Sequence, residues 1–277
     1  MNITNKLLNF IAVKLESISY RLHLINECSR LKSAGKFLPD NYKKLIIKAP
    51  VRYDDFINFI CFLDNNLPIN LIDIGANVGD FTKDFLMFFP RAKKVICFEP
   101  ICKLIPEIQK NVQDKRVSII NAGLSSKAKK ITINYPENNT TLASFHTYNK
   151  NVNEFYKVAK TISEKVKVLK LDEICSDFSK TQPFIIKIDT QGHEIDVIKG
   201  GLKVISKASI LILECSFVSE YEEKAPSFLM ASKLLESINF YPIIFQKYNR
   251  KISSYAFERD VIFVKKDYLP NIFYKNY

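Results

Sequence analysis

Two carboxylates and two glycines lie at the ends of two consecutive apolar runs, the first of which turns into a predicted helix. Asp73-Ile-Gly-Ala-Asn-Val-Gly79 ends one apolar run, and Glu99 ends a second, 20 residues after Gly79. Glycine allows positive φ and lets a ligand come close to the backbone. A carboxylate at the end of the next strand can accept hydrogen bonds from both hydroxyls of a ribose. The pair predicts a binding site for an adenosine-type cofactor.

The residue types of this turn favour S-adenosylmethionine over a dinucleotide. Asn77 stands where the dinucleotide fingerprint has its middle glycine, which lets a pyrophosphate sit against the backbone. Asp73 would repel a diphosphate but attract a cation, and S-adenosylmethionine carries a sulfonium, an ammonium and no phosphate. No Gly-Lys-Ser/Thr follows, so a P-loop is absent. An NAD-dependent enzyme and a structural turn without ligand are the alternatives.

A second cluster of acid–base side chains follows the apolar strand 184–188. Lys187 and Asp189 fall on one face of that strand, and His193 and Glu194 follow after a glycine. Buried charges need partners, so such a cluster is costly as mere core. We predict catalytic roles for all four, with Asp189 first and His193 second as the base that takes a proton from a hydroxyl. Lys187 would lower the pKa of a neighbouring acid. The alternative is a structural ion pair beside a helix whose first turn carries Glu194.

From residue 69 onward, strand and helix patterns alternate, which predicts an α/β fold with a doubly wound, mostly parallel sheet. The predicted strands are 70–74, 94–98, 117–121, 130–135, 165–170, 184–189, 209–215, 241–246 and 260–265. The predicted helices are 80–89, 103–113, 171–177, 194–206 and 227–238. Ligands of such sheets bind beyond the carboxyl ends of the strands. That rule selects the positions Asp73–Gly79, Glu99, Asn121, Lys187–Glu194 and Glu214.

Residues 1–66 form a predicted helical appendage to a domain at 67–277. Apolar residues recur at helical spacing within 1–32, and a second helix is predicted over 53–65. The chain has a net charge of +12, and half of the excess lies in residues 1–48. We expect the amphipathic helix to pack on the domain or form a homodimer, with peripheral contact to an anionic membrane as the alternative. Nucleic acid is disfavoured as a partner, because no RNA-binding signature is visible.

The N-terminus lacks the pattern of a signal peptide, and no apolar run has the ~18–20 residues that span a bilayer. We therefore expect a cytoplasmic protein, with attachment to a membrane surface as the alternative. The six cysteines lack zinc-ligand spacing and are expected to be reduced and buried. Residues 136–164 are polar and are predicted to cross the mouth of the site, with an inert surface loop as the equal alternative. Several aromatic residues are candidates to stack on a sugar ring: Tyr135, Phe145, Tyr148, Phe217 and Tyr221.

Five motifs in order carry a resemblance to a known family. They are Asp73–Gly79, Phe98-Glu-Pro100, Lys187–Glu194 with Val197-Ile-Lys-Gly-Gly201, Leu213-Glu214, and Asp260-Val-Ile-Phe-Val264. Together they resemble the FkbM family of methyltransferases over roughly residues 67–265. The resemblance implies a Rossmann-like class I fold, S-adenosylmethionine as methyl donor, and O-methylation of a sugar, glycan or glycan-linked acceptor.

The resemblance also implies roles for individual residues. Lys187, Asp189, Gly192 and Glu194 fall on the family's K-x-D-x-x-G-x-E motif, whereas His193 occupies a variable position and inherits no role. The complete predicted cofactor site is Asp73, Gly75, Ala76, Asn77, Gly79, Glu99 and Asn121. No metal ligands are predicted, although Mg²⁺ held by Asp189, Glu194 and Glu214 is a disfavoured alternative. An RNA 2′-O-methyltransferase and a non-catalytic scaffold are the other functions considered.

Overall fold

The computed structural model describes residues 3–148, 154, 160–178, 183–217, 228–245 and 258–269. The chain divides into two compact units, Met1–Asn66 and Leu67–Tyr277. Each unit is described by itself below. No helix in the described part of the chain is long and apolar enough to cross a membrane.

The first unit consists of three helices, α1 (Ile3–Ser33), α2 (Tyr42–Lys48) and α3 (Pro50–Phe62). Helix α3 begins and ends three residues before the predicted 53–65, because Pro50 occupies its first turn, where a missing N–H costs nothing. Helix α2 was not predicted. Phe56 and Ile60 of α3 are buried, whereas Phe10, Leu15 and Leu22 of α1 are exposed. The apolar stripe expected on α1 is therefore open to solvent along much of its described length.

The second unit is built on a seven-stranded sheet in the order β3-β2-β1-β7-β8-β10-β9. Its strands are β1 (Asn70–Ile74), β2 (Val95–Phe98), β3 (Val117–Ile120), β7 (Phe184–Ile188), β8 (Ile210–Ser216), β9 (Phe240–Phe245) and β10 (Glu258–Lys265). Six of these seven strands run in the same direction, and β10 runs antiparallel to them between β8 and β9. The sheet has the doubly wound, Rossmann-like class I arrangement that was predicted. β1 and β7 are buried at every position, as strands covered on both faces must be.

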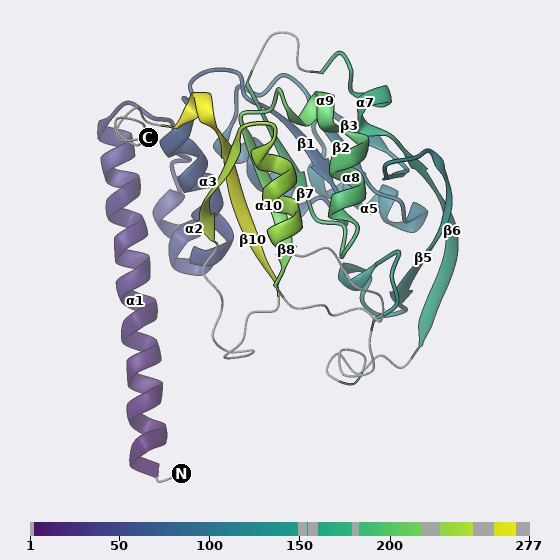
Figure 1. Ribbon diagram of the computed structural model, residues 1–277. Coiled ribbons are helices and arrows are strands. Elements are labelled where there is room, and N and C mark those ends of the chain that lie inside the picture. The colour runs from purple at the N-terminus through teal and green to yellow at the C-terminus, as the bar shows by residue number, and fades with distance from the viewer. Residues whose placement is uncertain are drawn as a thin grey trace. The chain divides into compact units, whose positions relative to one another are not determined.

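The helices of the second unit connect these strands. They are α4 (Asp80–Phe88), α5 (Ile105–Val112), α7 (Leu171–Ile174), α8 (Glu194–Gly200), α9 (Leu202–Ile205) and α10 (Phe228–Glu236), with short 3₁₀ turns η1 (Cys102–Leu104), η2 (Thr140–Leu142) and η3 (Lys266–Tyr268). Figure 1 shows α8 and α10 side by side on one face of the sheet. One helix was predicted over 194–206, but it is divided into α8 and α9 at the Gly200-Gly201 pair. A Cβ at Gly200 would lie 2.1 Å from the Ser125 carbonyl oxygen, so glycine permits this contact.

A smaller three-stranded sheet lies between β3 and β7 in the chain. It consists of β4 (Gly123–Leu124), β5 (Lys129–Pro136) and β6 (Thr161–Leu169), in the order β4-β6-β5. Strand β6 begins four residues before the predicted 165–170. Ile133 and Val166 on this sheet pack with Ile101 and Leu104 from the segment after β2. The small sheet is therefore attached close to the carboxyl end of β2.

The central sheet reverses its direction of winding at β1. The chain proceeds outward from β1 through β2 to β3, and then resumes at β7 on the other side of β1. Asp73 pairs with Cys97 of β2 and with Lys187 of β7, so the two sequence motifs meet across adjacent strands. Such a switch point is where open α/β sheets bind ligands.

The cysteines differ in part from the expectation. All six are free thiols, but Cys61 and Cys102 are exposed rather than buried. Burial raises the pKa of the Cys175 thiol to about 11, with Lys94 acting in the opposite direction. Cys175 is therefore an inert buried side chain at neutral pH.

Candidate active site at the switch point

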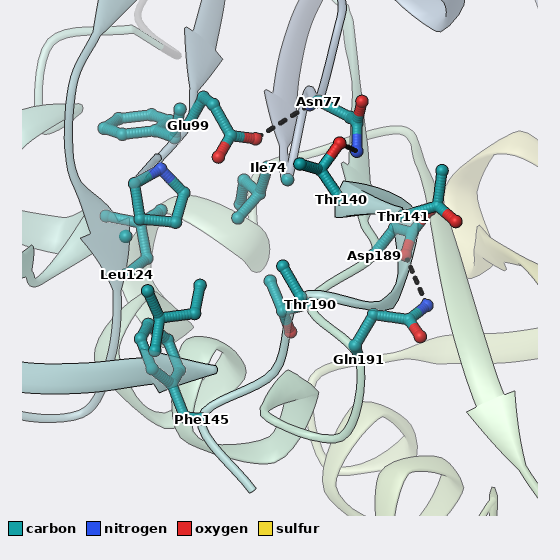
Figure 2. Close-up of a pocket in the computed structure, with 16 residues that line it drawn as sticks. Ile74, Asn77, Glu99, Leu124, Thr140, Thr141, Phe145, Asp189, Thr190 and Gln191 are labelled. Atoms are coloured by element: carbon teal, nitrogen blue, oxygen red, sulfur yellow. Dashed lines mark hydrogen bonds between the residues drawn. The ribbon is translucent and has the colours of Figure 1, made fainter. Parts of the chain in front are cut away.

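A cavity opens at the carboxyl ends of β1, β2 and β7 (Figure 2). The residues that line it are Ile74, Gly75, Asn77, Phe98, Glu99, Pro100, Gly123, Leu124, Ile133, Thr140, Thr141, Ala143, Phe145, Asp189, Thr190 and Gln191. Figure 2 shows Leu124 and Phe145 on one side of the cavity and Asp189 and Gln191 on the other. The cavity thus has an apolar wall facing a polar one.

The turn after β1 packs directly against the end of β7. Gly75 has φ +81°, and a Cβ there would lie 1.9 Å from the carbonyl oxygen of Asp189. The Asp189 amide also donates to the Ile74 carbonyl oxygen at 3.0 Å. Gly79 has φ +82°, but a Cβ there would meet only side-chain methyl groups of Ile108 and Val112. The close approach that requires Gly75 is therefore to the protein's own backbone, where we had expected a ligand.

The amides of this turn are used within the protein. Gly75 and Ala76 both donate to the Phe98 carbonyl oxygen, at 3.0 and 3.1 Å, and Gly79 donates to the Ala76 carbonyl oxygen at 2.7 Å. The Asn77 amide donates to Glu99 Oε2 at 2.8 Å. A pyrophosphate site needs backbone N–H groups that point at the ligand. These four amides are therefore not available to a pyrophosphate.

Glu99 is held at the rim of the cavity by two backbone amides. Its Oε2 accepts from Asn77 and its Oε1 from Ile101, each at 2.8 Å. Burial raises the pKa of Glu99 to about 7, with repulsion from Asp73 and Asp189 in the same direction and the two amides opposing it. Asn121 does not line the cavity, but its side-chain amide donates to the Glu99 carbonyl oxygen at 2.9 Å and fixes the strand end. The carboxylate is oriented before any ligand arrives.

Lys187 lies beneath the cavity among carboxylates. Its ammonium donates to Asp189 Oδ2 at 2.7 Å, and its side chain is only 11% exposed. Burial by itself would lower the pKa of Lys187, but Asp189, Asp73 and Asp260 together raise it above its ordinary value. Asp73 is fully buried and accepts from Thr82 Oγ1 at 2.7 Å. Burial raises the pKa of Asp73, against the attraction of Lys187. Asp73 and Lys187 thus form the floor of the site rather than its lining.

Asp189 is the member of this cluster that opens into the cavity. Its side chain is 32% exposed, whereas Lys187 behind it is nearly covered. Burial would raise the pKa of Asp189, but the charge of Lys187 and hydrogen bonds from Lys187, Glu214 and Gln191 outweigh it and lower the pKa. Asp189 is consequently a carboxylate at neutral pH. Lys187 holds one of its oxygens, and the side chain is open to the cavity. It can accept a proton from a group placed in the cavity.

His193 and Glu194 are not part of the cavity lining. His193 Nε2 lies 3.0 Å from Ser125 Oγ in a buried site, and burial lowers the pKa of the imidazole to about 4. Glu194 Oε1 accepts from Thr190 N, Thr190 Oγ1 and Gly192 N at 3.0, 3.0 and 3.1 Å. Glu194 therefore closes the turn that carries the polar wall. Burial raises its pKa, and these hydrogen bonds oppose the shift.

Sequence reasoning missed most of the cavity walls. Thr140, Thr141, Ala143 and Phe145 come from the segment after β5, and Thr190 and Gln191 follow Asp189. The strand-end rule had selected the range Lys187–Glu194, which contains Thr190 and Gln191. For Thr140, Thr141 and Ala143 the signal was the polar composition of residues 136–164. Of the aromatic candidates for stacking, Phe145 lines the cavity. Tyr221 lies outside the described residues.

No group of three His, Cys, Asp or Glu residues within the described ranges is arranged to hold a metal ion. Near Lys187, Asp189 accepts from the Lys187 ammonium and the Gln191 amide, and Asp73 accepts from Thr82 through one of its oxygens.

The chain was compared with protein families and with known proteins. The model of the Methyltransferase FkbM domain family matches residues 73–250, more than half of the chain. The 2-O-methyltransferase NoeI of Sinorhizobium fredii is 27% identical over 164 residues, covering 56% of this chain and 67% of that protein. The hexuronic acid methyltransferase AglP of Haloferax volcanii is 25% identical over 146 residues, covering 52% of this chain and 54% of that protein.

A crystal structure of methyltransferase FkbM from Methylobacillus flagellatus KT aligns with a TM-score of 0.48 and 14% identity, covering 71% of this chain and 43% of that one. The region matched by this chain spans about two thirds of NoeI and about half of AglP. The family match begins at Asp73, near the end of β1, and covers the glycine turn, β7 and the acid–base cluster. The resemblance predicted from the motifs is confirmed, and the chain belongs to the FkbM methyltransferase family.

Proposed function

We propose that this protein transfers a methyl group from S-adenosylmethionine to a hydroxyl of a sugar or glycan. The observation that carries the proposal is the position of Asp189, an ionised carboxylate that opens into the same cavity as Glu99. The names of NoeI and AglP, a 2-O-methyltransferase and a hexuronic acid methyltransferase, support a sugar hydroxyl as acceptor.

The cavity residues fit S-adenosylmethionine. Glu99 has the geometry to bind the ribose hydroxyls, and the turn after β1 offers no phosphate cradle. Buried carboxylates beneath the turn make the site favourable for a cation. When bound, the cofactor supplies an electrophilic methyl group on a sulfonium. NAD fits this site poorly, because its pyrophosphate would meet amides that are already engaged.

Asp189 acts as the general base in this proposal. A hydroxyl is a poor nucleophile until its proton is removed, and Asp189 accepts that proton as the oxygen attacks. Lys187 holds the carboxylate in place and keeps it ionised until then. The apolar wall of Leu124 and Phe145 excludes water and offers a face for a sugar ring. The acceptor oxygen must sit opposite the sulfur, so this wall has to fix its position.

The first test is methyl transfer with isotope-labelled S-adenosylmethionine. The acceptor panel contains uronic acids, oligosaccharides with free 2-hydroxyls, and structured RNA, and mass spectrometry locates the methyl group. We expect a sugar methyl ether and no change in turnover with EDTA. Transfer to RNA alone would replace the sugar proposal with the nucleic-acid alternative. Absence of cofactor binding in titration calorimetry would favour a non-catalytic module.

Glu99 predicts a pH dependence of cofactor binding. With a pKa near 7, Glu99 is about one tenth ionised at pH 6 and about nine tenths at pH 8. Since the carboxylate accepts both ribose hydroxyls, affinity should rise about tenfold from pH 6 to pH 8. Titration calorimetry at the two pH values measures this ratio. In Glu99→Gln, binding of S-adenosylmethionine should be weaker at pH 8 by roughly tenfold. The rise in affinity between pH 6 and pH 8 should vanish. An equal ratio in both proteins would contradict the assignment.

A further inference from the structure

Gln191 connects the segment after β5 to the carboxylates at the ends of β7 and β8 in a way that the motif does not explain. Its backbone oxygen accepts from Ser144 Oγ at 2.6 Å, and its Oε1 accepts from Tyr148 OH at 2.9 Å. Its Nε2 donates to Asp189 Oδ1 at 3.2 Å and also to Glu214 Oε2. One side chain thus joins the segment after β5 to the ends of β7 and β8.

The orientation of this amide follows from its partners. An ionised carboxylate only accepts hydrogen bonds, so the NH₂ group of Gln191 must face Asp189. That leaves Oε1 to accept from the Tyr148 hydroxyl. This bridge couples the two residues that it joins. A movement of Tyr148 would shift the Gln191 amide and so displace the donor to Asp189.

The backbone of Gln191 makes this arrangement costly. Its φ is +51°, in the left-handed region that favours glycine and asparagine. A residue with a longer side chain pays about 1 kcal/mol there. Four hydrogen bonds to Gln191 groups offset the cost. The strain turns the side chain toward the carboxylates while the carbonyl faces Ser144.

The segment that Gln191 holds forms part of the cavity. Thr140, Thr141, Ala143 and Phe145 line it, and Ser144 exchanges backbone hydrogen bonds with Asn134 of β5 at 2.8 and 2.9 Å. At its other end, Asn77 Nδ2 donates to Thr140 Oγ1 at 3.4 Å. The segment therefore touches the cofactor turn at one end and Gln191 at the other. An acceptor seated against this wall would press on both contacts.

We propose that Gln191 is a positioning residue that couples the acceptor-binding wall, residues 140–148, to the orientation of Asp189. The proposal rests on the proposed methyltransferase function and adds the route by which acceptor binding orients the base. When the wall is in place, Tyr148 holds the amide and the amide holds Asp189 Oδ1, leaving the remaining face of the carboxylate to the acceptor. Without the wall, Asp189 keeps Lys187 but loses the donor that sets its direction.

The charge environment of Asp189 makes this coupling measurable as a pH profile. The charged and titratable groups that face it are Lys187 on the same strand, Asp73 on β1, Glu99 after β2, Glu214 on β8 and Asp260 on β10. Lys187 is the one cation in this set, and the Gln191 amide adds a neutral donor that favours the ionised form of Asp189. Losing the Gln191 donor raises the pKa of Asp189.

Gln191→Asn tests the bridge with little disturbance of the backbone. Asparagine keeps the amide and tolerates positive φ, but it is one methylene too short to span both partners. We expect kcat to fall about 10- to 100-fold, with affinity for S-adenosylmethionine within about twofold. The acidic limb of kcat/KM should move upward by about 0.5–1 pH unit. Wild-type kcat with an unmoved acidic limb would overturn the proposal.

Tyr148→Phe is the matched variant, because it removes only the wall side of the bridge. We expect it to raise KM for the acceptor about three- to tenfold with a smaller effect on kcat. Combined with Gln191→Asn it should add little, since both changes break one connection. If the kinetic losses of the two single variants add fully in the double variant, the two residues act independently and the proposed coupling is overturned.

Amide hydrogen exchange separates this proposal from the proposed function. In Gln191→Asn, peptides that cover residues 140–148 should exchange at least about tenfold faster than in wild type, while peptides from α4 stay unchanged. This readout needs no turnover. If no sugar is methylated, the proposed function fails, and unchanged exchange in 140–148 overturns the bridge separately.

Discussion

Replacing Asp189 with asparagine is expected to lower kcat by about 10²- to 10⁴-fold, the range that a general base contributes. Asparagine has nearly the same shape and its Oδ1 can still accept from Lys187, so the variant removes the basic group and leaves the cavity in place. Affinity for S-adenosylmethionine should stay within about threefold. Steady-state kinetics with a sugar acceptor, together with calorimetric titration of the cofactor, measure both quantities.

His193→Gln is the matched control for the base. His193 was the second candidate from the sequence, but it lies outside the cavity lining and contacts Ser125. Glutamine can keep a hydrogen bond to Ser125, so turnover at pH 8 should remain within about threefold of wild type. Near-normal kcat in Asp189→Asn with a folded protein would sink the assignment of Asp189. A large loss confined to His193→Gln would transfer the role of base to the histidine.

Gly75→Ala is expected to destabilise the protein by about 4 kcal/mol or more, or to prevent folding of the second unit. The added Cβ would lie 1.9 Å from the Asp189 carbonyl oxygen, and neither backbone can move without breaking the β1–β7 pairing. The positive φ adds about 1–2 kcal/mol of strain. If some protein folds, Asp189 should be displaced and methyl transfer lost.

Two other glycines with similar φ separate the clash from the strain. Gly35 has φ +77° and open space around its Cβ position, so Gly35→Ala should cost only about 1 kcal/mol. Gly79 has φ +82° and meets side-chain methyls, which can shift, so Gly79→Ala should cost about 2 kcal/mol. Urea unfolding of the three variants measures the order. Equal losses in Gly75→Ala and Gly35→Ala would contradict the contact between the turn and Asp189.

Hydrophobic patterns were sufficient to predict the central sheet. Continuous apolar runs such as 70–74 and 184–188 are typical of strands buried on both faces, and each became such a strand. Local patterns were weaker where a single residue decides a boundary. Pro50 occupies the first turn of α3, and Gly200, the last residue of α8, lies against the Ser125 carbonyl group, where a Cβ would not fit. That neighbour is 75 residues away in the chain, so no local pattern reports it.

Some site residues could be identified from type and position, but their roles required the fold. Gly75, Asn77, Glu99 and Asp189, which the sequence selected, line the cavity. Asp73, Lys187 and Glu194 carry titratable groups too, but they lie outside the cavity lining and hydrogen-bond to other protein groups. The difference is direction: sequence shows which groups are near a strand end, whereas packing decides which of them faces the cavity.

The sequence by itself determined the fold class, the strand ends that carry the site, and the preference for a cationic cofactor, because these depend on local periodicity and residue chemistry. Only the tertiary structure decided that Gly75 accommodates the Asp189 backbone, that His193 is not part of the cavity lining, and that Gln191 joins the 140–148 wall to Asp189. Each of these is a contact between strands or loops far apart in the chain. Such contacts arise from the register of β1 against β7, which residue types alone do not specify.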